Sequence, residues 1–220
     1  MSHAVISKKH RKPEPRGPRW RRRKEARPAE IVAAALDVFV ERGYTRTKLD
    51  DVARRAGVTK GTLYHYFQSK EALFKAVVRE TLVQSIARGE VLAESHTGSA
   101  RDLCRTLVRE WWRQVGETKA SGIPKLMMAE AVNFPDLARF YYDEVVSRGH
   151  RLLSGAIERG IASGEFRPVD VPLAVRLLMA PLLHAMQWRY SFALCVREPF
   201  DVARYLDLHF DLFINGIANA

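Results

Sequence analysis

Residues 56–67 read Ala-Gly-Val-Thr-Lys-Gly-Thr-Leu-Tyr-His-Tyr-Phe, and this stretch gives the clearest indication of the structure of the N-terminal third of the chain. Gly57 suits the left-handed residue that follows one short helix, and Thr59 suits the N-cap of the next. Leu63 and Phe67 are four residues apart, so both can face supporting helices. Four side chains remain for the opposite surface: Lys60, Thr62, Tyr64 and Tyr66. A tight turn between two short helices is the geometry that presents one helix end to the major groove of DNA.

Helix signals flank this stretch on both sides. We expect a first helix to begin at Pro28 and to stop at Gly43, because proline suits the first helical position and glycine the end. The apolar side chains of this helix recur on one face: Ile31, Ala35, Leu36, Phe39 and Val40. A second helix is expected to start at Thr47, with Asp50 completing an approximate capping box, and Ser69 is expected to cap a fourth.

The start of the expected third helix is suited to an anion. The amides around Thr59 and Lys60 have no partner within a helix, and such free amides favour a phosphate. Gly61 has no side chain, so the backbone there can approach that phosphate closely. These features predict phosphate contacts at this helix end.

An ordered series of residues runs through these expected helices: Gly43-Tyr44, Thr47, Asp51-Val52-Ala53, all of 56–67, and Ser69-Lys70-Glu71-Ala72-Leu73. Between Pro28 and Val78 the chain thereby resembles the DNA-binding signature of the TetR/AcrR family of transcriptional regulators. The resemblance implies contacts with DNA bases at Lys60, Gly61, Thr62, Tyr64 and His65. It implies contacts with phosphates at Thr47, Thr59, Tyr66 and Lys70.

Each of these side chains has another interpretation. Tyr64 can be a core aromatic rather than a partner of the DNA backbone. Lys60 and Lys70 can be ordinary solvated lysines, and His65 can lie exposed beside DNA without touching it. Phe67, by contrast, is expected in the core.

The positive charge is concentrated at the N-terminus. Residues 1–70 contain 18 Lys and Arg against 7 Asp and Glu, whereas residues 71–220 contain 18 against 18, so the net charge of +11 lies in the first third. This distribution is typical of a polyanion-binding module joined to a neutral one. Residues 1–27 are rich in Lys, Arg and Pro, and we expect a disordered basic arm. The arm either contacts DNA or is a solubilising tail, and its length departs from the short arms common in the TetR/AcrR family.

Beyond this signature, apolar residues recur at helical spacing, as at Leu103, Leu107 and Trp111. Glycine and proline breaks divide residues 71–220 into roughly five or six further helices. The expected fold is all-α. It comprises an N-terminal three-helix helix-turn-helix DNA-binding domain at 28–75 and a larger helical ligand-binding and dimerisation domain at 76–220.

Several classes of protein are disfavoured. Cys104 and Cys195 are too few for a disulfide framework, and no Cys/His cluster suggests a metal site. The N-terminus is charged and no apolar run is long enough to span a bilayer, so we expect a cytoplasmic protein with no signal peptide and no membrane partner. No Gly-x-Ser-x-Gly, His-Glu-x-x-His or phosphate-loop motif is present, so we expect neither an enzyme nor a cofactor.

The last two expected helices, at 172–193 and 199–217, are candidates for a dimer interface. Their large side chains are Leu177, Leu178, Pro181, Leu182, Ala185, Trp188, Tyr205, Leu208, Leu212 and Phe213. In the TetR/AcrR family these helices pair with their symmetry mates in a four-helix bundle, so the resemblance implies a homodimer. The alternative is that they bury these side chains against their own chain.

Aromatic and Met residues in the larger domain predict a pocket for a small molecule. The candidates are Trp111, Trp112, Met127, Met128, Phe134, Phe140, Tyr141, Tyr142 and His150. We prefer Trp112, Met127 and Tyr142 as ligand contacts. Residues of these types at helical spacing can equally be core.

The sequence therefore predicts a homodimeric repressor that binds a palindromic operator in double-stranded DNA and is released by a small apolar or aromatic effector. Two alternatives stay open: a regulator that needs no ligand, and an activator. An empty cavity of a few hundred cubic ångströms in the larger domain would count against the first.

Overall fold

The computed structural model describes residues 19–197 and 200–219, and its regular structure in that part of the chain is helical. Three helices form the N-terminal unit, which we call the reading head: α1 (Arg19–Arg46), α2 (Leu49–Arg55) and α3 (Lys60–Tyr66). The only β-type pairing in the described residues is an isolated bridge between Phe166 and Ala218. The expected all-α fold is confirmed.

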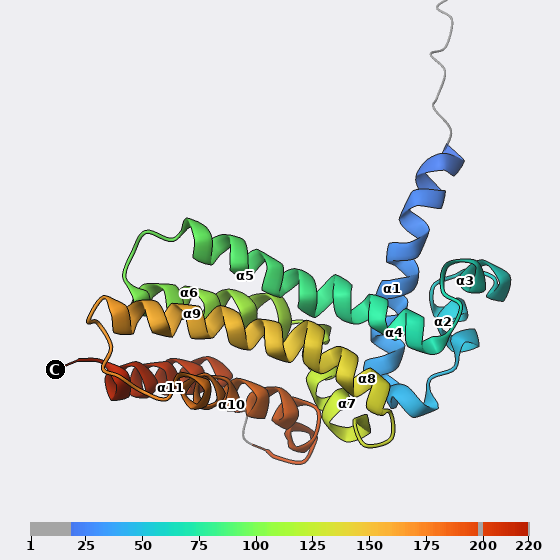
Figure 1. The fold of residues 1–220 in the computed structure, drawn as a ribbon. Coiled ribbons are helices and arrows are strands. Elements are labelled where there is room, and N and C mark those ends of the chain that lie inside the picture. Colours follow the sequence, from blue (N-terminus) through green and yellow to red (C-terminus); the bar gives the residue numbers. More distant parts are fainter. Residues whose placement is uncertain (1–18, 198–199, 220) are drawn as a thin grey trace, which may run out of the picture.

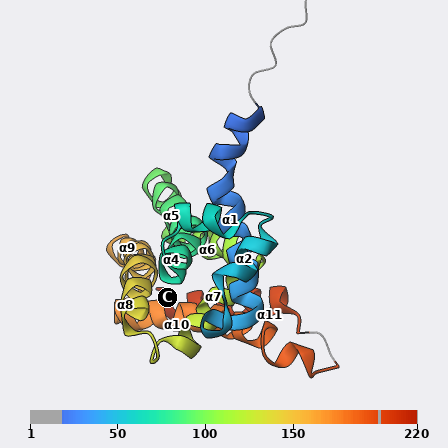
Figure 2. The same ribbon diagram turned by 90° about the vertical axis from the view of Figure 1, so that its right-hand side faces the viewer.

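The remaining helices form an elongated body with the reading head at one end and the C-terminus at the other (Figure 1). Their bounds are α4 (Lys70–Val78), α5 (Gln84–Ser95), α6 (Ala100–Trp111), α7 (Gly122–Glu130), α8 (Pro135–Tyr141), α9 (Arg148–Ala162), α10 (Val171–Arg189) and α11 (Val202–Ile217). Viewed from the reading-head end, the first turns of α1 project beyond the body (Figure 2).

The start expected for the first helix at Pro28 is wrong, because α1 begins at Arg19 and contains Pro28. The residues at 19–27 are mostly Arg, Lys, Glu and Ala, which favour helix, so the helix extends upstream of the proline. Proline inside a helix removes one backbone hydrogen bond and crowds the carbonyl four residues earlier, and α1 continues through Pro28 despite this cost. Of the basic arm expected at 1–27, residues 1–18 lie outside the described part of the chain, whereas the basic run at 21–24 is helical.

The start expected for the second helix at Thr47 is also wrong. The helix begins at Leu49 after Lys48, whose side chain makes no capping hydrogen bond. Thr47 is only 2% exposed, and its hydroxyl donates to the carbonyl oxygen of Gly43 at 2.7 Å. Gly43 has a φ of +78°, a backbone conformation that glycine adopts readily, and it ends the regular part of α1 as the sequence predicts.

Several body helices continue into one another through π-helical turns. Residues 70–95 run through the turn Arg79–Val83, residues 100–116 end in the turn Trp112–Gly116, and residues 135–162 run through the turn Tyr142–Ser147. A π-turn contains one more residue per hydrogen-bonded ring than an α-helical turn, and it therefore changes which side chains face inward.

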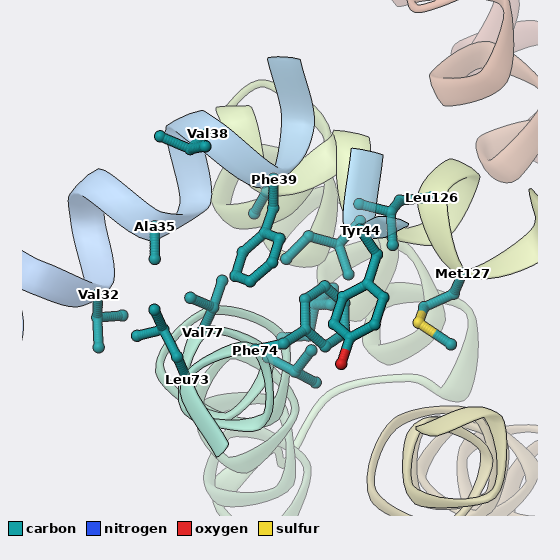
Figure 3. Packing of buried hydrophobic residues seen from close by; sticks show 14 of the residues in the cluster. Val32, Ala35, Val38, Phe39, Tyr44, Leu73, Phe74, Val77, Leu126 and Met127 are labelled. Atoms are coloured by element: carbon teal, nitrogen blue, oxygen red, sulfur yellow. The ribbon is translucent and has the colours of Figure 1, made fainter. Parts of the chain in front are cut away.

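The core of the reading head continues into the body. Phe39 of α1 contacts the rings of Tyr44 and Phe74, with centroids 5.8 and 5.0 Å apart. Figure 3 shows these rings between α1 and α4, with Leu126 and Met127 of α7 beside them. A second core cluster joins α6, α9, α10 and α11. The reading head is thus fixed to the body by buried side chains rather than by a linker.

Candidate DNA-binding surface and effector cavity

The start of α3 is shaped by Thr59. Its hydroxyl oxygen accepts a hydrogen bond from the backbone N–H of Thr62 at 3.1 Å and lies 2.9 Å from the hydroxyl of Thr62. Leu63 is fully buried and holds the helix against its neighbours, as expected, while Phe67 packs half-buried against the core. The threonine cap and the leucine anchor together leave the opposite face of α3 in solvent.

The other expected contacts of α3 lie on or beside that open face. Lys60, Gly61, Tyr64 and His65 are exposed, and Tyr64 is 43% exposed rather than a core aromatic. Thr62 is half-buried. Tyr66 is also half-buried, with its ring 5.1 Å from that of His65. We call Thr59, Lys60, Gly61, Thr62, Tyr64, His65 and Tyr66 the α3 face.

Lys60 already has an acidic neighbour. Its ammonium nitrogen lies 2.9 Å from Oδ1 of Asp50, and this hydrogen bond raises the pKa of Lys60. Both side chains are more than half exposed, so the pair is weak and its lysine can exchange a carboxylate for a phosphate.

Thr47 and Lys70 face inward instead. The hydroxyl of Thr47 donates to the carbonyl oxygen of Gly43 in this structure. Lys70 donates to the carbonyl oxygens of Tyr44 at 2.9 Å and Thr45 at 3.2 Å, and its ammonium lies 4.5 Å from the centre of the Tyr44 ring. Burial lowers the pKa of Lys70. In this structure both residues stabilise the end of α1, because its last carbonyls need donors, and their phosphate contacts stay a prediction.

An acidic side chain from the body meets this same helix end. Glu130 of α7 accepts from the backbone N–H of Thr45 at 3.1 Å and from its hydroxyl at 3.0 Å. Burial opposes ionisation of Glu130, but the hydrogen bonds from Thr45 and Asn133 and the charge of Lys70 leave its pKa lowered. The sequence carries no signal for this contact, because its partners are 85 residues apart.

A largely apolar cavity of about 120 Å³ lies inside the body. Most of its lining comes from α5, α6, α9, α10 and the π-turn Tyr142–Ser147. Of the nine residues proposed from the sequence, three line it: Trp111, Tyr141 and His150.

The three preferred contacts lie elsewhere. Met127 is 3% exposed and belongs to the core beside the reading head, while Tyr142 is 56% exposed. Trp112 packs against Gly116, where an added Cβ would lie 2.3 Å from its ring. In each adjacent pair, 111/112 and 141/142, the first member lines the cavity and the second does not. Composition could not decide which member does.

The cavity also contains polar groups, of which Ser85 and Glu110 were not expected from the sequence. Ser85 is buried on α5 and its hydroxyl has no hydrogen-bond partner. Glu110 accepts from Arg113 and Gln114, and these bonds lower its pKa to about 2. Burial raises the pKa of Tyr141 and lowers that of His150.

Comparison with known proteins shows which family has this architecture. Residues 31–77 match the family described as "Bacterial regulatory proteins, tetR family", and residues 94–191 match "Tetracyclin repressor-like, C-terminal domain". The uncharacterised HTH-type transcriptional regulator YfiR of Bacillus subtilis is 32% identical over 157 residues, which are 69% of this chain and 73% of that protein. The chain belongs to the TetR family.

Other relatives agree with this assignment. The transcriptional repressor KstR2 of Rhodococcus jostii is 29% identical over 75% of this chain and 80% of that protein. The fatty acid metabolism regulator of B. subtilis is 24% identical over 89% and 99%. The crystal structure of FadR from B. subtilis in complex with stearoyl-CoA shares the fold, with a TM-score of 0.67. The two chains are 22% identical, and the match covers 86% of this chain and 98% of FadR.

The protein is therefore a TetR-family transcriptional regulator that binds DNA, and not an enzyme. No helix in the described residues could span a membrane.

Proposed function

We propose that this TetR-family regulator is a homodimeric cytoplasmic repressor that binds a palindromic operator and leaves it when a small apolar molecule enters the body. One observation carries the proposal. The continuous helix 70–95 packs on α1 through Phe74 at one end and lines the cavity through Ser85, Ile86 and Gly89 further along. A ligand that displaces this helix therefore also displaces the reading head.

The α3 face supplies the proposed DNA contacts. Lys60, Tyr64 and His65 are exposed enough to reach base edges, and the capped start of α3 at Thr59 offers its free amides to a phosphate. Tyr66 and Thr62 lie at the margin of this face. Basic residues at 1–24 add sequence-independent attraction to the duplex.

We assign the DNA-binding domain to residues 28–75 and the ligand-binding and dimerisation domain to 76–220. The boundary falls inside α4. Because helix 70–95 crosses it unbroken, the two domains share a rigid element, and this continuity is what couples them in the proposal.

The proposed dimer uses the outer face of α10 and α11. Leu177, Leu208 and Leu212 are each more than half exposed, as is Leu173, which the sequence analysis did not include. Leu178, Leu182 and Ala185 are instead buried in their own chain. Exposed leucines gathered on two adjacent helices favour pairing with a second copy. Leu212→Glu is expected to give monomers in sedimentation analysis; a dimer of unchanged stability would contradict this interface.

The cavity limits the size of the effector. Ligand sites for drug-sized molecules usually occupy about 300–1,000 Å³, and the cavity here is about 120 Å³. A ligand larger than a single ring must therefore widen it. The small volume also favours the second candidate, a regulator whose body needs no ligand.

One experiment separates these candidates. Genomic fragments retained by the protein are sequenced to obtain the operator, and small molecules are screened for release of that operator. Linkage requires the ligand to bind the free protein more tightly than the operator complex, by the same factor as it weakens DNA binding. Tight binding to random duplex at physiological salt would contradict operator recognition, and equal ligand affinities in the two states would contradict induction.

A further inference from the structure

The hydroxyl of Ser85 has nothing to bond with. The residue is 4% exposed, and no hydrogen-bond partner exists for its oxygen. Buried hydroxyls are nearly always paired, so an unpaired one indicates an unseen partner. Ser85 lines the cavity, which is the one place from which such a partner could come.

Helical serines and threonines usually satisfy themselves by donating to the carbonyl four residues earlier. In this chain Thr81 donates to Val77, Ser95 to Val91 and Thr106 to Asp102. Ser85 does not, and it is the second residue after the π-turn Arg79–Val83. Ser85 therefore presents a hydroxyl at the cavity wall without the usual internal acceptor.

The rest of the wall shows which chemistry suits this hydroxyl. No Lys or Arg lines the cavity in the described part of the chain, and the Glu110 carboxylate is already bound by Arg113 and Gln114. His150 is kept uncharged near neutral pH, because burial lowers its pKa. The nearest guanidinium groups are those of Arg88 and Arg113 beside Glu110 and of Arg176 beside His150, and none of them lines the cavity. An anion would thus find no cationic group in the wall itself, and a cation no free carboxylate.

Tyr141 is a second hydroxyl-bearing residue that lines the same cavity. Burial is the only cause of its raised pKa, and it makes no hydrogen bond to another described residue. The remaining wall is apolar, with Leu152, Met179 and Leu183 among its members.

We propose that the effector is an uncharged apolar molecule with one oxygen group, such as a ketone, that binds the hydroxyls of Ser85 and Tyr141. The proposal rests on the effector site inferred above and adds the class of molecule it selects. An ionised carboxylate of the same shape is rejected, because its charge would be buried without a partner.

Three probes of similar shape test this selectivity: acetophenone, benzoate and ethylbenzene. Calorimetry on the full-length protein without DNA is expected to show acetophenone binding most tightly and benzoate least. Ser85→Ala is expected to weaken acetophenone about 3- to 10-fold, as for one lost hydrogen bond, and to leave ethylbenzene unchanged. Thermal denaturation without ligand checks that the variant folds, and its midpoint is expected not to fall, because an unpaired hydroxyl has been removed.

A substitution at Gly149 tests whether the probes bind in this cavity. An added Cβ at Gly149 would contact Ile86 at 3.8 Å inside the cavity, so Gly149→Ala should weaken both acetophenone and ethylbenzene. Benzoate binding as tightly as acetophenone, an unchanged acetophenone affinity in Ser85→Ala, or no binding of any probe would each overturn the inference. If the selectivity holds but acetophenone fails to release the operator, the repressor mechanism fails and the ligand class stands.

Discussion

Glu130 on α7 holds Thr45 at the end of α1 by two hydrogen bonds, to the backbone N–H at 3.1 Å and to the side-chain hydroxyl at 3.0 Å. The ammonium of Lys70 meets the same helix end by binding the carbonyl of Thr45 at 3.2 Å. The N–H and hydroxyl of Thr45 are thus bound by α7, and the carbonyl of Thr45 is bound by α4. A shift of either helix must move the reading head.

Glu130→Gln is expected to weaken the coupling between ligand and DNA. The amide nitrogen cannot accept a hydrogen bond, so the Thr45 hydroxyl and Asn133 lose the acceptor oxygen that they share, and the charge near Lys70 is removed. The ratio of ligand affinities for the free protein and the operator complex, about 5 to 150 for a coupled system, should fall toward one. Titration calorimetry in both states measures it. Glu158→Gln, an exposed carboxylate change on α9, is the control, and equal ratios in all three proteins would refute the role of Glu130.

Lys60 and Lys70 are expected to behave differently in DNA binding. Lys60→Ala should weaken operator binding and reduce the slope of log affinity against log salt by up to about one unit, because one cation at the DNA surface is lost. Lys70→Met should leave that slope unchanged and lower the melting temperature, because its bonds to Tyr44 and Thr45 are internal. Operator binding across a salt series and thermal unfolding together measure this. A reduced slope for Lys70→Met would support its phosphate contact.

Two glycines of α9 form a matched pair for testing the cavity. Gly149→Ala and Gly155→Ala should each stabilise the helix by about 0.5–1 kcal/mol, because glycine is a poor helix former. Only Gly149 lines the cavity; an added Cβ at Gly155 meets nothing within 4 Å. Both variants should therefore melt at higher temperature, but only Gly149→Ala should bind a releasing ligand more weakly. Equal ligand affinity in the two variants would place the ligand elsewhere.

Acid should remove a stabilising contribution of Glu110. The hydrogen bonds from Arg113 and Gln114 lower its pKa from the ordinary 4.5 to about 2. The folded state thus binds this proton less readily than the unfolded state, so the contribution is present above about pH 4.5 and is lost as the pH falls toward 2. Urea unfolding at about pH 5 and pH 3 should show a smaller loss in Glu110→Gln than in the unaltered protein. An equal loss would mean that these bonds do not stabilise the fold.

The reading head was predictable because its signals are local. Thr59, Leu63 and Gly43 act within one or two turns, so cap, anchor and helix end follow from the sequence. The inward roles of Thr47 and Lys70 did not, since each depends on a carbonyl that packing brings near. The start of α1 was misplaced because Pro28 was interpreted as a boundary, although the residues before it favour helix.

The cavity was less predictable for a different reason. Residue type indicated an apolar site, and Trp111, Tyr141 and His150 do line it. Which of two adjacent residues, such as Trp111 and Trp112, lines the cavity depends on the direction of each side chain about the helix axis, and the π-turns change that direction. Ser85 had no distinguishing signal, because one serine in a helix looks like any other until the turn before it is known.

The π-turn Tyr142–Ser147 contributes Val145 and Val146 to the cavity and is flanked by two more lining residues, Tyr141 and Gly149. Such a turn can be regarded as an amino-acid insertion that a helix has absorbed without breaking. Deleting one residue there would restore regular winding and change which residues of the turn face the cavity, while the helices on either side keep their orientation. A single codon loss in a descendant gene could thus replace Val145 or Val146 in the cavity wall, and ligand preference in this lineage could change by length as well as by substitution.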